Sequence, residues 1–196
     1  PTTARCESAL VAVRFLGFFR VWRGSNTVFD GVDLWLPDVV YDTQATYVRV
    51  PPSARRECEQ LGLSFREGVH AANHALLNVV PLFLTANGND LGTECDNPYD
   101  SRYRIERLLL YDKHRGGGTG LAAAAAPRMP QLLEAAYGRV VECGCEYGKG
   151  CPQCVQHLAC RNYNAVLSKA GAEVVLRHVL MQEREHAAQV AGQEQQ

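Results

Sequence analysis

The cysteines near the end of the chain are the residues whose type and spacing most clearly support chemistry. Five of the eight cysteines lie in the stretch CGCEYGKGCPQCVQHLAC, residues 143–160. Cys143 with Cys145 and Cys151 with Cys154 form two close pairs, and the residues between them include two glycines that permit a chain reversal. Zinc takes four such thiolates tetrahedrally. The spacing therefore predicts a zinc site built by these four cysteines, with Cys160 as a fifth candidate.

Disulfides, an iron–sulfur cluster and uncoordinated thiols are the other interpretations of this cysteine cluster. The chain begins without a secretory signal pattern, and reducing compartments keep thiols available as metal ligands. An odd number of clustered cysteines also fits disulfides poorly, and the spacing differs from that of ferredoxins. Four protein ligands leave no position for a reactive water, so we expect a structural Zn²⁺. The spacing does not decide which four of the five sulfurs bind it.

Two histidines form a second candidate group. His70 and His74 stand four residues apart on a predicted helix, so both imidazoles face the same side. Asp90 is a possible third member, either as a ligand or as an orienting partner. The catalytic glutamate of an H-E-x-x-H motif is missing, because Ala71 follows His70. A buried hydrogen-bonded network is the alternative, and we assign no catalytic residue; a hydrolase built on these three residues remains a third functional hypothesis.

A glycine-rich loop at residues 116–120 comes before a predicted helix. Its amides could hold a phosphate, or the glycines could serve only a sharp turn between strand and helix. Lys113 and Arg115 lie beside this loop, while Arg161 and Lys169 follow the cysteines. These four cations are the predicted nucleic-acid contacts. Aromatic residues such as Trp22 and Trp35 fall in predicted strands, where such side chains are usually part of the core.

Charge and composition limit the possible functions. Lys plus Arg total 20 and Asp plus Glu total 21, so the chain has no overall positive field, and any contact with DNA must be local and sensitive to salt. The most apolar run, residues 9–22, is shorter than a membrane span and contains two arginines. We therefore expect no membrane partner. The only Gly-Lys pair, Gly148-Lys149, lies inside the cysteine cluster, so a phosphate loop for ATP is missing.

The order of predicted elements indicates an α+β fold. Strand-forming residues and turns dominate residues 9–51, and an apolar period of three to four residues follows over residues 65–80. We expect an N-terminal β-meander and a mixed sheet packed with helices. The cysteine knuckle, residues 143–160, should lie between two helices near the C-terminus. We expect one domain over residues 1–186 and a disordered tail at 187–196. The further predicted elements are a strand at 104–111, helical segments at 121–142 and a last helix at 165–184.

A series of short motifs resembles one known family. The motifs are GVHAANHAL at 68–76, NDLG at 89–92, YD at 111–112, GGGTGLA at 116–122, the two cysteine pairs with GCPQCVQ at 150–156, and NAVLSK at 164–169. In this order they are similar to the C-terminal zinc-binding (MZB) domain of MrfA- and Hrq-type superfamily 2 DNA-repair helicases of the RecQ-like group. The resemblance covers nearly the whole chain.

The resemblance implies a zinc-stabilised accessory domain of an ATP-dependent helicase. Its partners would be the RecA-like motor domains of the same polypeptide, which would hold ATP and Mg²⁺, and DNA, which we expect to be single-stranded. It would help to guide the DNA or to couple it to the motor, and this chain alone would not be the ATPase. It also implies an intracellular location, nuclear in a eukaryote and cytoplasmic in a bacterium. The alternative is a zinc-stabilised scaffold that recruits repair proteins.

Overall fold

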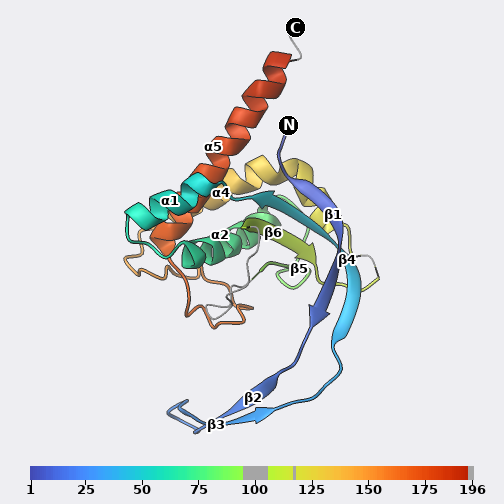
Figure 1. Ribbon diagram of the computed structural model, residues 1–196, viewed down its shortest axis with the longest axis vertical. Helices are drawn as coiled ribbons and strands as arrows, with labels where there is room; N and C mark the ends of the chain where they lie inside the picture. The colour runs from blue at the N-terminus through green and yellow to red at the C-terminus, as the bar shows by residue number, and fades with distance from the viewer. Residues whose placement is uncertain (95–105, 117, 194–196) are drawn as a thin grey trace.

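The computed structural model describes residues 1–94, 106–116 and 118–193. Strands come first in the chain: β1 (Arg5–Val13), β2 (Gly17–Val21), β3 (Val28–Asp33) and β4 (Val39–Arg49). Their pairing is nested, because β1 pairs with β4 and β2 pairs with β3, each antiparallel. The four strands therefore form one long ribbon, the far part of which extends away from the rest of the molecule (Figure 1).

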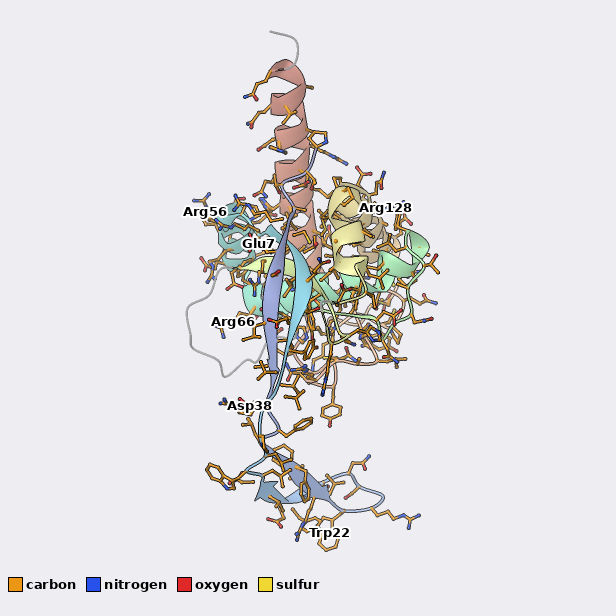
Figure 2. All side chains as sticks on the ribbon, turned by 90° about the vertical axis from the view of Figure 1, so that its right-hand side faces the viewer. Glu7, Trp22, Asp38, Arg56, Arg66 and Arg128 are labelled. Carbon is orange, nitrogen blue, oxygen red and sulfur yellow. The ribbon has the colours of Figure 1, made fainter. Side chains whose placement is uncertain are left out.

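The far part of this ribbon, residues 14–38, is called the arm below. Its large side chains are open to solvent, with Trp35 exposed by 95%, Phe19 by 75% and Trp22 by 61%. The expectation that the aromatics of these strands belong to the core is therefore wrong. The physical reason is that, among the described residues, the ribbon here has only two strands and no helix packs on it, as Figure 2 shows around Trp22. Arg14 and Asp38 pair at 2.7 Å at the base of the arm.

The near part of the ribbon belongs to the main sheet, which has the order β1-β4-β6-β5. β5 (Leu91–Gly92) and β6 (Arg107–Asp112) complete it, and each described pairing is antiparallel. Alternate residues of β4 and β6 point into the core, so Val48, Leu108 and Leu110 are fully buried. The sheet therefore has one face under helices, as an α+β fold requires.

Helices cover that face. The α-helices of the described residues are α1 (Pro52–Gln60), α2 (Phe65–Val79), α3 (Leu121–Ala125), α4 (Met129–Glu142) and α5 (Lys169–Gln193), and short 3₁₀ turns lie at Val80–Leu82 and Ala126–Arg128. α2 is the central helix and is buried over most of its length, because α4, α5 and β6 all pack against it. Ser64 caps its first turn by accepting from the backbone N–H of Glu67.

Two glycines allow α2 and α5 to cross in backbone contact. A Cβ atom on Gly68 would lie 2.8 Å from the carbonyl oxygen of Gly171, and a Cβ on Gly171 would lie 2.8 Å from the Cα of Gly68. No larger residue fits at either position without separating the helices. This close crossing fixes where α5 begins, next to the cysteines.

α5 begins at Lys169, four residues after the predicted start, because Ser168 acts as its cap and accepts from the N–H of Gly171 at 3.0 Å. The helix continues to Gln193, beyond the predicted domain boundary at residue 186. The boundary itself and the disordered tail at 187–196 stay predictions. Among the described residues, no helix combines the length and apolar character needed to cross a membrane. The fold class is confirmed: an α+β domain with the cysteine knuckle between α4 and α5.

Candidate metal centre

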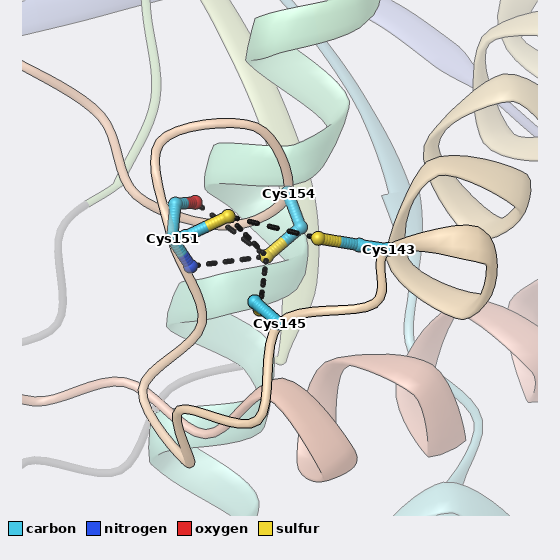
Figure 3. A group of neighbouring side chains, drawn as sticks. All are labelled: Cys143, Cys145, Cys151 and Cys154. Carbon is cyan, nitrogen blue, oxygen red and sulfur yellow. Dashed lines mark hydrogen bonds between the residues drawn. The ribbon is translucent and has the colours of Figure 1, made fainter.

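The four predicted cysteines come together at one point. The sulfur of Cys143 lies 3.6 Å from that of Cys151, Cys145 lies 3.7 Å from Cys154, and Cys151 lies 3.8 Å from Cys154. Four sulfurs at 2.3 Å from a tetrahedral zinc would be about 3.8 Å apart. The cluster therefore has the donor set and the spacing of a closed four-thiolate metal site (Figure 3).

The second cysteine pair is positioned by a tight turn. The carbonyl of Cys151 accepts from the N–H groups of Cys154 at 3.0 Å and Val155 at 3.2 Å, and the N–H of Cys151 donates to the Cys154 sulfur at 3.1 Å. Gly150, just before the turn, has a φ of 66°. A Cβ there would lie 2.3 Å from Val155 Cγ2, so only glycine fits.

Lys169 fastens the first cysteine pair to α5. Its ammonium donates to the carbonyls of Cys143 at 2.6 Å and Cys145 at 2.9 Å, while its backbone N–H donates to Gly148 at 2.9 Å. The first residue of α5 thus holds the segment that follows α4. Its charge also faces a cluster that becomes negative when four thiolates bind one Zn²⁺.

The protein sets the acidity of these thiols unequally. The backbone N–H of Cys145 lowers the pKa of Cys143 to about 7, whereas burial raises the pKa of Cys154 to about 12. A cation deprotonates coordinating thiols outright, because its charge outweighs such differences. A bound metal would therefore override the unequal pKa values of these thiols.

Helix α2 holds the segment that follows the second cysteine pair. His70 Nδ1 donates to the carbonyl of Val166 at 2.8 Å, and His74 Nδ1 donates to that of Val155 at 3.0 Å. Asn78 Nδ2 donates to the carbonyl of Gln156 at 3.0 Å. Side chains of α2 therefore hold in place the backbone that follows the second cysteine pair.

Cys160 lies apart from the four-cysteine cluster. It groups with His70 and His74, and the three ligand atoms all lie within 4.8 Å of one another. Asp90 does not complete this group as hypothesised. It accepts from the N–H of Asn87 at 2.7 Å and lies 3.2 Å from His114 Nε2, since it belongs to the turn before β5. Burial lowers the pKa of His70 and lowers that of His74 to about 3, so both imidazoles are neutral at pH 7.

The four predicted nucleic-acid contacts lie in different surroundings. Lys113 and Arg161 line a common cavity of about 130 Å³, whose wall also includes His74 and His157. Arg115 is exposed in the loop after β6. Lys169 holds the knuckle carbonyls, a role that sequence spacing gave no sign of, and its contact with DNA stays a prediction.

The glycine loop is occupied by a carboxylate of the protein itself. Asp112, fully buried at the end of β6, accepts from Thr119 Oγ1 at 3.0 Å and from the N–H groups of Gly120 at 3.1 Å and Ala122 at 3.2 Å. A Cβ on Gly118 would lie 2.4 Å from that carboxylate. Gly118 and Gly120 thus serve a turn around Asp112, which supports the structural interpretation of these two glycines.

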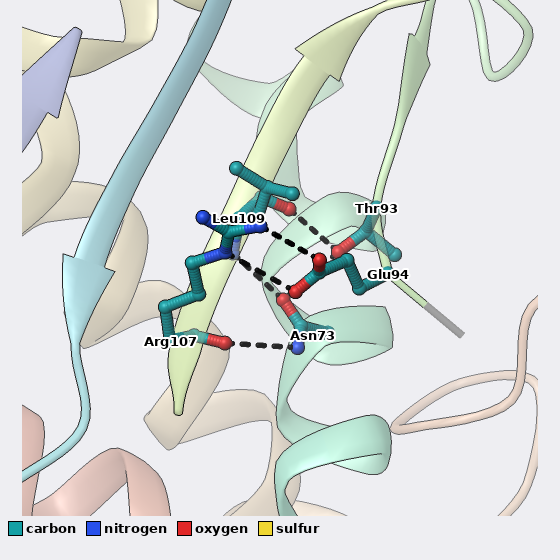
Figure 4. Close-up of polar contacts among 5 residues, drawn as sticks. All are labelled: Asn73, Thr93, Glu94, Arg107 and Leu109. Atoms are coloured by element: carbon teal, nitrogen blue, oxygen red, sulfur yellow. Dashed lines mark hydrogen bonds and ion pairs between the residues drawn. The ribbon is translucent and has the colours of Figure 1, made fainter. Parts of the chain in front are cut away.

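A polar network on β6 is a further feature that sequence reasoning missed (Figure 4). Asn73 Oδ1 accepts from the N–H of Leu109 and from Thr93 Oγ1, both at 2.8 Å, and its Nδ2 donates to the carbonyl of Arg107 at 3.3 Å. The Arg107 guanidinium pairs with Glu94 at 2.8 Å. The amide side chain therefore joins α2 to the strand edge, next to the histidines. In the sequence, this network is indicated only by the position of Asn73 between His70 and His74.

Comparison with known proteins agrees with this geometry. A family model described as the MrfA Zn-binding domain matches residues 72–155, the segment that contains the four clustered cysteines. The ATP-dependent helicase HRQ1 of Saccharomyces cerevisiae is 31% identical over 172 residues, covering 84% of this chain and 16% of the relative. The ATP-dependent helicase hrq1 of Schizosaccharomyces pombe is 30% identical over 177 residues, covering 85% of this chain and 17% of the relative.

A solved structure shares the fold. The DUF1998 helicase MrfA bound to DNA superposes with a TM-score of 0.58 at 18% identity, over 89% of this chain and 22% of that one. The chain therefore spans only a small part of the length of the helicases it resembles. The sequence motifs, the fold and the four-cysteine cluster all indicate the same zinc-binding domain. Residues 72–155 belong to the MrfA Zn-binding domain family, and the chain around them is similar to Hrq1-type helicases.

Proposed function

We propose that Cys143, Cys145, Cys151 and Cys154 bind one structural Zn²⁺ that joins the end of α4 to the start of α5. The convergence of their four sulfurs within a matched zinc-binding family segment is the observation that carries this proposal. Structural zinc contributes about 10 to 16 kcal/mol in small zinc-finger peptides, against a net domain stability of about 5 to 15 kcal/mol. The metal is therefore strong enough to decide whether the knuckle stays docked.

We further propose that the domain is an accessory part of an ATP-dependent DNA helicase. The two relatives are named ATP-dependent helicases, and the chain covers 16–17% of their length. Their remaining length is ample for RecA-like motor domains, which would bind ATP and Mg²⁺. The location we propose is intracellular, and nuclear in a eukaryote.

The arm supports docking on those motor domains. Its exposed aromatic and aliphatic side chains, such as Trp35 and Phe19, form a surface that a stable isolated protein rarely carries. Its charges balance, because residues 14–38 contain three arginines and three aspartates. A neutral apolar surface suits a protein partner better than a phosphate backbone. We therefore assign the arm to the motor part of the same polypeptide.

The DNA contact we propose is local and weak on its own. Lys113 and Arg161 share one cavity wall, and Arg115 is exposed on the loop that follows β6. With a net charge of −1, the chain adds no long-range attraction to these contacts. We expect the domain to guide single-stranded DNA that the motor already holds.

The test is binding of the chain to single-stranded DNA, measured by fluorescence anisotropy across a series of salt concentrations. We expect binding at low salt that falls steeply as salt rises, and a loss of affinity of roughly tenfold or more when Lys113 and Arg161 are both changed to Gln. The matched control changes Arg56 and Arg184, two exposed arginines on α1 and α5, to Gln. Equal losses in both double variants would count against a specific DNA path.

The scaffold that recruits repair proteins is the second candidate, and the exposed arm favours it equally well on apolar area alone. The two are separated by adding the motor part of the parent helicase in trans. We expect the chain to bind the motor, and the double change Phe19→Ser with Trp35→Ser to abolish this binding without loss of thermal stability. If the chain binds neither the motor nor DNA but binds a repair protein through the arm, the scaffold hypothesis is correct.

A further inference from the structure

We infer a second metal site, separate from the four-cysteine cluster, in which His70, His74 and Cys160 bind a zinc-class divalent cation. Their ligand atoms lie within 4.8 Å of one another, and His70 Nε2 is 3.6 Å from the Cys160 sulfur. The two imidazole rings meet edge to face with centroids 4.4 Å apart. His70 and Cys160 both lie outside residues 72–155, the segment that the zinc-binding family model matches.

Both histidines are oriented as metal ligands usually are. A carbonyl oxygen can only accept, so Nδ1 of each ring carries the proton that is donated to Val166 or Val155. In a neutral imidazole the other nitrogen, Nε2, then has the lone pair. Metal-bound histidines are held in this manner, with the far N–H on a carbonyl or carboxylate that fixes the tautomer and the ring orientation.

The cysteine is held in the same way. The backbone N–H of Asn164 donates to the Cys160 sulfur at 3.3 Å, an interaction that stabilises a thiolate. Asn164 has a φ of 57°, in the left-handed region, which aims this N–H. Two reciprocal hydrogen bonds of 3.0 Å between Asn164 and His157 fix the loop in this conformation. The loop is therefore built around the sulfur.

The donor set selects the type of ion. Two neutral imidazoles and one thiolate are the borderline ligands that zinc prefers, while Mg²⁺ and Ca²⁺ require oxygen ligands. The three side chains are buried, with exposures of 0%, 0% and 7%, so a bound ion would be shielded from solvent. One Zn²⁺ and one thiolate together carry a net charge of +1. Burying this charge costs less than burying the +2 charge of an ion that has only neutral ligands.

The site would have a mechanical role. It joins the middle of α2 to Cys160 at the end of the knuckle, whereas the four-cysteine site joins the end of α4 to the second cysteine pair. Three protein ligands leave one tetrahedral position. The cavity of about 130 Å³ that His74 and His157 line borders the group and has room for a water there.

The variant-free test is the number of zinc ions per chain, measured by elemental analysis after extensive dialysis. We expect two per chain. In the cadmium-substituted chain, ¹¹³Cd NMR should give two resonances, one in the position of a four-sulfur site and one shifted upfield by nitrogen ligands. One zinc per chain with a single four-sulfur resonance would overturn the second site. That result would leave the four-cysteine site, and so the proposed function, intact.

Variants then assign the second ion. We expect His70→Gln and Cys160→Ser each to bind one zinc and to keep the four-sulfur resonance. The matched controls are His114→Gln and Cys6→Ser, which change an exposed histidine and an exposed cysteine outside both groups and should keep two. If the His70 and Cys160 variants still bind two ions, the three side chains form only a hydrogen-bonded core cluster, and the inference is refuted.

Discussion

Gly150→Ala is the substitution whose effect on the metal centre follows most directly from the geometry of the cysteine turn. Gly150 has a φ of 66°, and an added Cβ would lie 2.3 Å from Val155 Cγ2 and 2.9 Å from the Cys154 sulfur. Gly62 provides an unusually close control. Its φ is 67°, yet an added Cβ there would have nothing within 4 Å. The two alanine variants therefore share the backbone cost and differ in the clash.

The magnitude follows from these two terms. Placing alanine in the left-handed region costs about 1 to 2 kcal/mol at either position. Overpacking adds about 1 to 3 kcal/mol at Gly150 only, because Val155 is fully buried and must move. Since the clash is next to a ligand sulfur, we expect the overpacking term to appear as weaker zinc binding. At 1.4 kcal/mol for each factor of ten, that is a loss of about 5- to 150-fold.

Zinc competition against a chromophoric chelator and urea unfolding of the zinc-bound chain measure the two quantities. Gly62→Ala should lower the free energy of unfolding by about 1 to 2 kcal/mol and leave the zinc affinity unchanged. Gly150→Ala should lose more stability and bind zinc more weakly. Equal stability loss and equal zinc affinity in both variants would refute the reasoning, because the contact between Gly150 and the cysteine turn would then be of no consequence.

Three further predictions concern the packing and charge around the centre. Gly171→Ala should destabilise the chain by about 1 to 3 kcal/mol in urea unfolding, because its Cβ meets the facing glycine of α2, whereas Gly192→Ala on the same helix has open space and should not. Asp112→Asn should lower the free energy of unfolding by about 1 to 3 kcal/mol, because the buried carboxylate that accepts from three donors is replaced by a neutral amide. Amide exchange at the start of α3 should become faster in this variant, and slower exchange would contradict the prediction. The hydrogen bond from His178 is the main cause that lowers the pKa of Glu57, so the Glu57 carboxylate stabilises the fold above the ordinary glutamate pKa, and this stabilisation is lost as the pH falls. Between pH 7 and pH 3, the unfolding midpoint should therefore fall less steeply for Glu57→Gln than for the unchanged chain. An equal slope in both chains would rule this out.

Local features of the fold could be predicted from the sequence. The apolar period over residues 65–80 located α2 to within a residue, because a helix buried on one stripe must repeat every three to four residues. The spacing of the two cysteine pairs also indicated the four sulfurs that converge, although it left Cys160 open as a fifth candidate. Both signals depend on neighbours in the sequence, and short-range geometry decides them.

Long-range partners could not be predicted in the same way. Cys160 meets His70 across 90 residues, and nothing in either local sequence indicates this contact. Asp90 has the chemistry of a histidine partner, but it belongs to a turn that takes it to His114. Lys169 was predicted to contact nucleic acid on charge alone, while its ammonium binds carbonyls that only the folded knuckle brings together.

The arm shows a different limit of pattern reasoning. Its residues have the composition of buried strands, and aromatic and β-branched residues do favour strands. The pattern predicts the strands correctly, but it cannot say whether another layer covers them. Here the described chain leaves the faces of β2 and β3 exposed, and nothing in the local sequence pattern indicates this.

The most direct test of the zinc-held knuckle is equilibrium unfolding of the purified chain before and after removal of metal with a strong chelator. We expect metal removal to lower the unfolding midpoint markedly and equimolar Zn²⁺ for each lost ion to restore it. The Cys145→Ser chain, which keeps only the His70, His74 and Cys160 group intact, should recover much less. A purified chain that contains no zinc, and whose unfolding curve is the same with and without chelator, would contradict the metal centre described here.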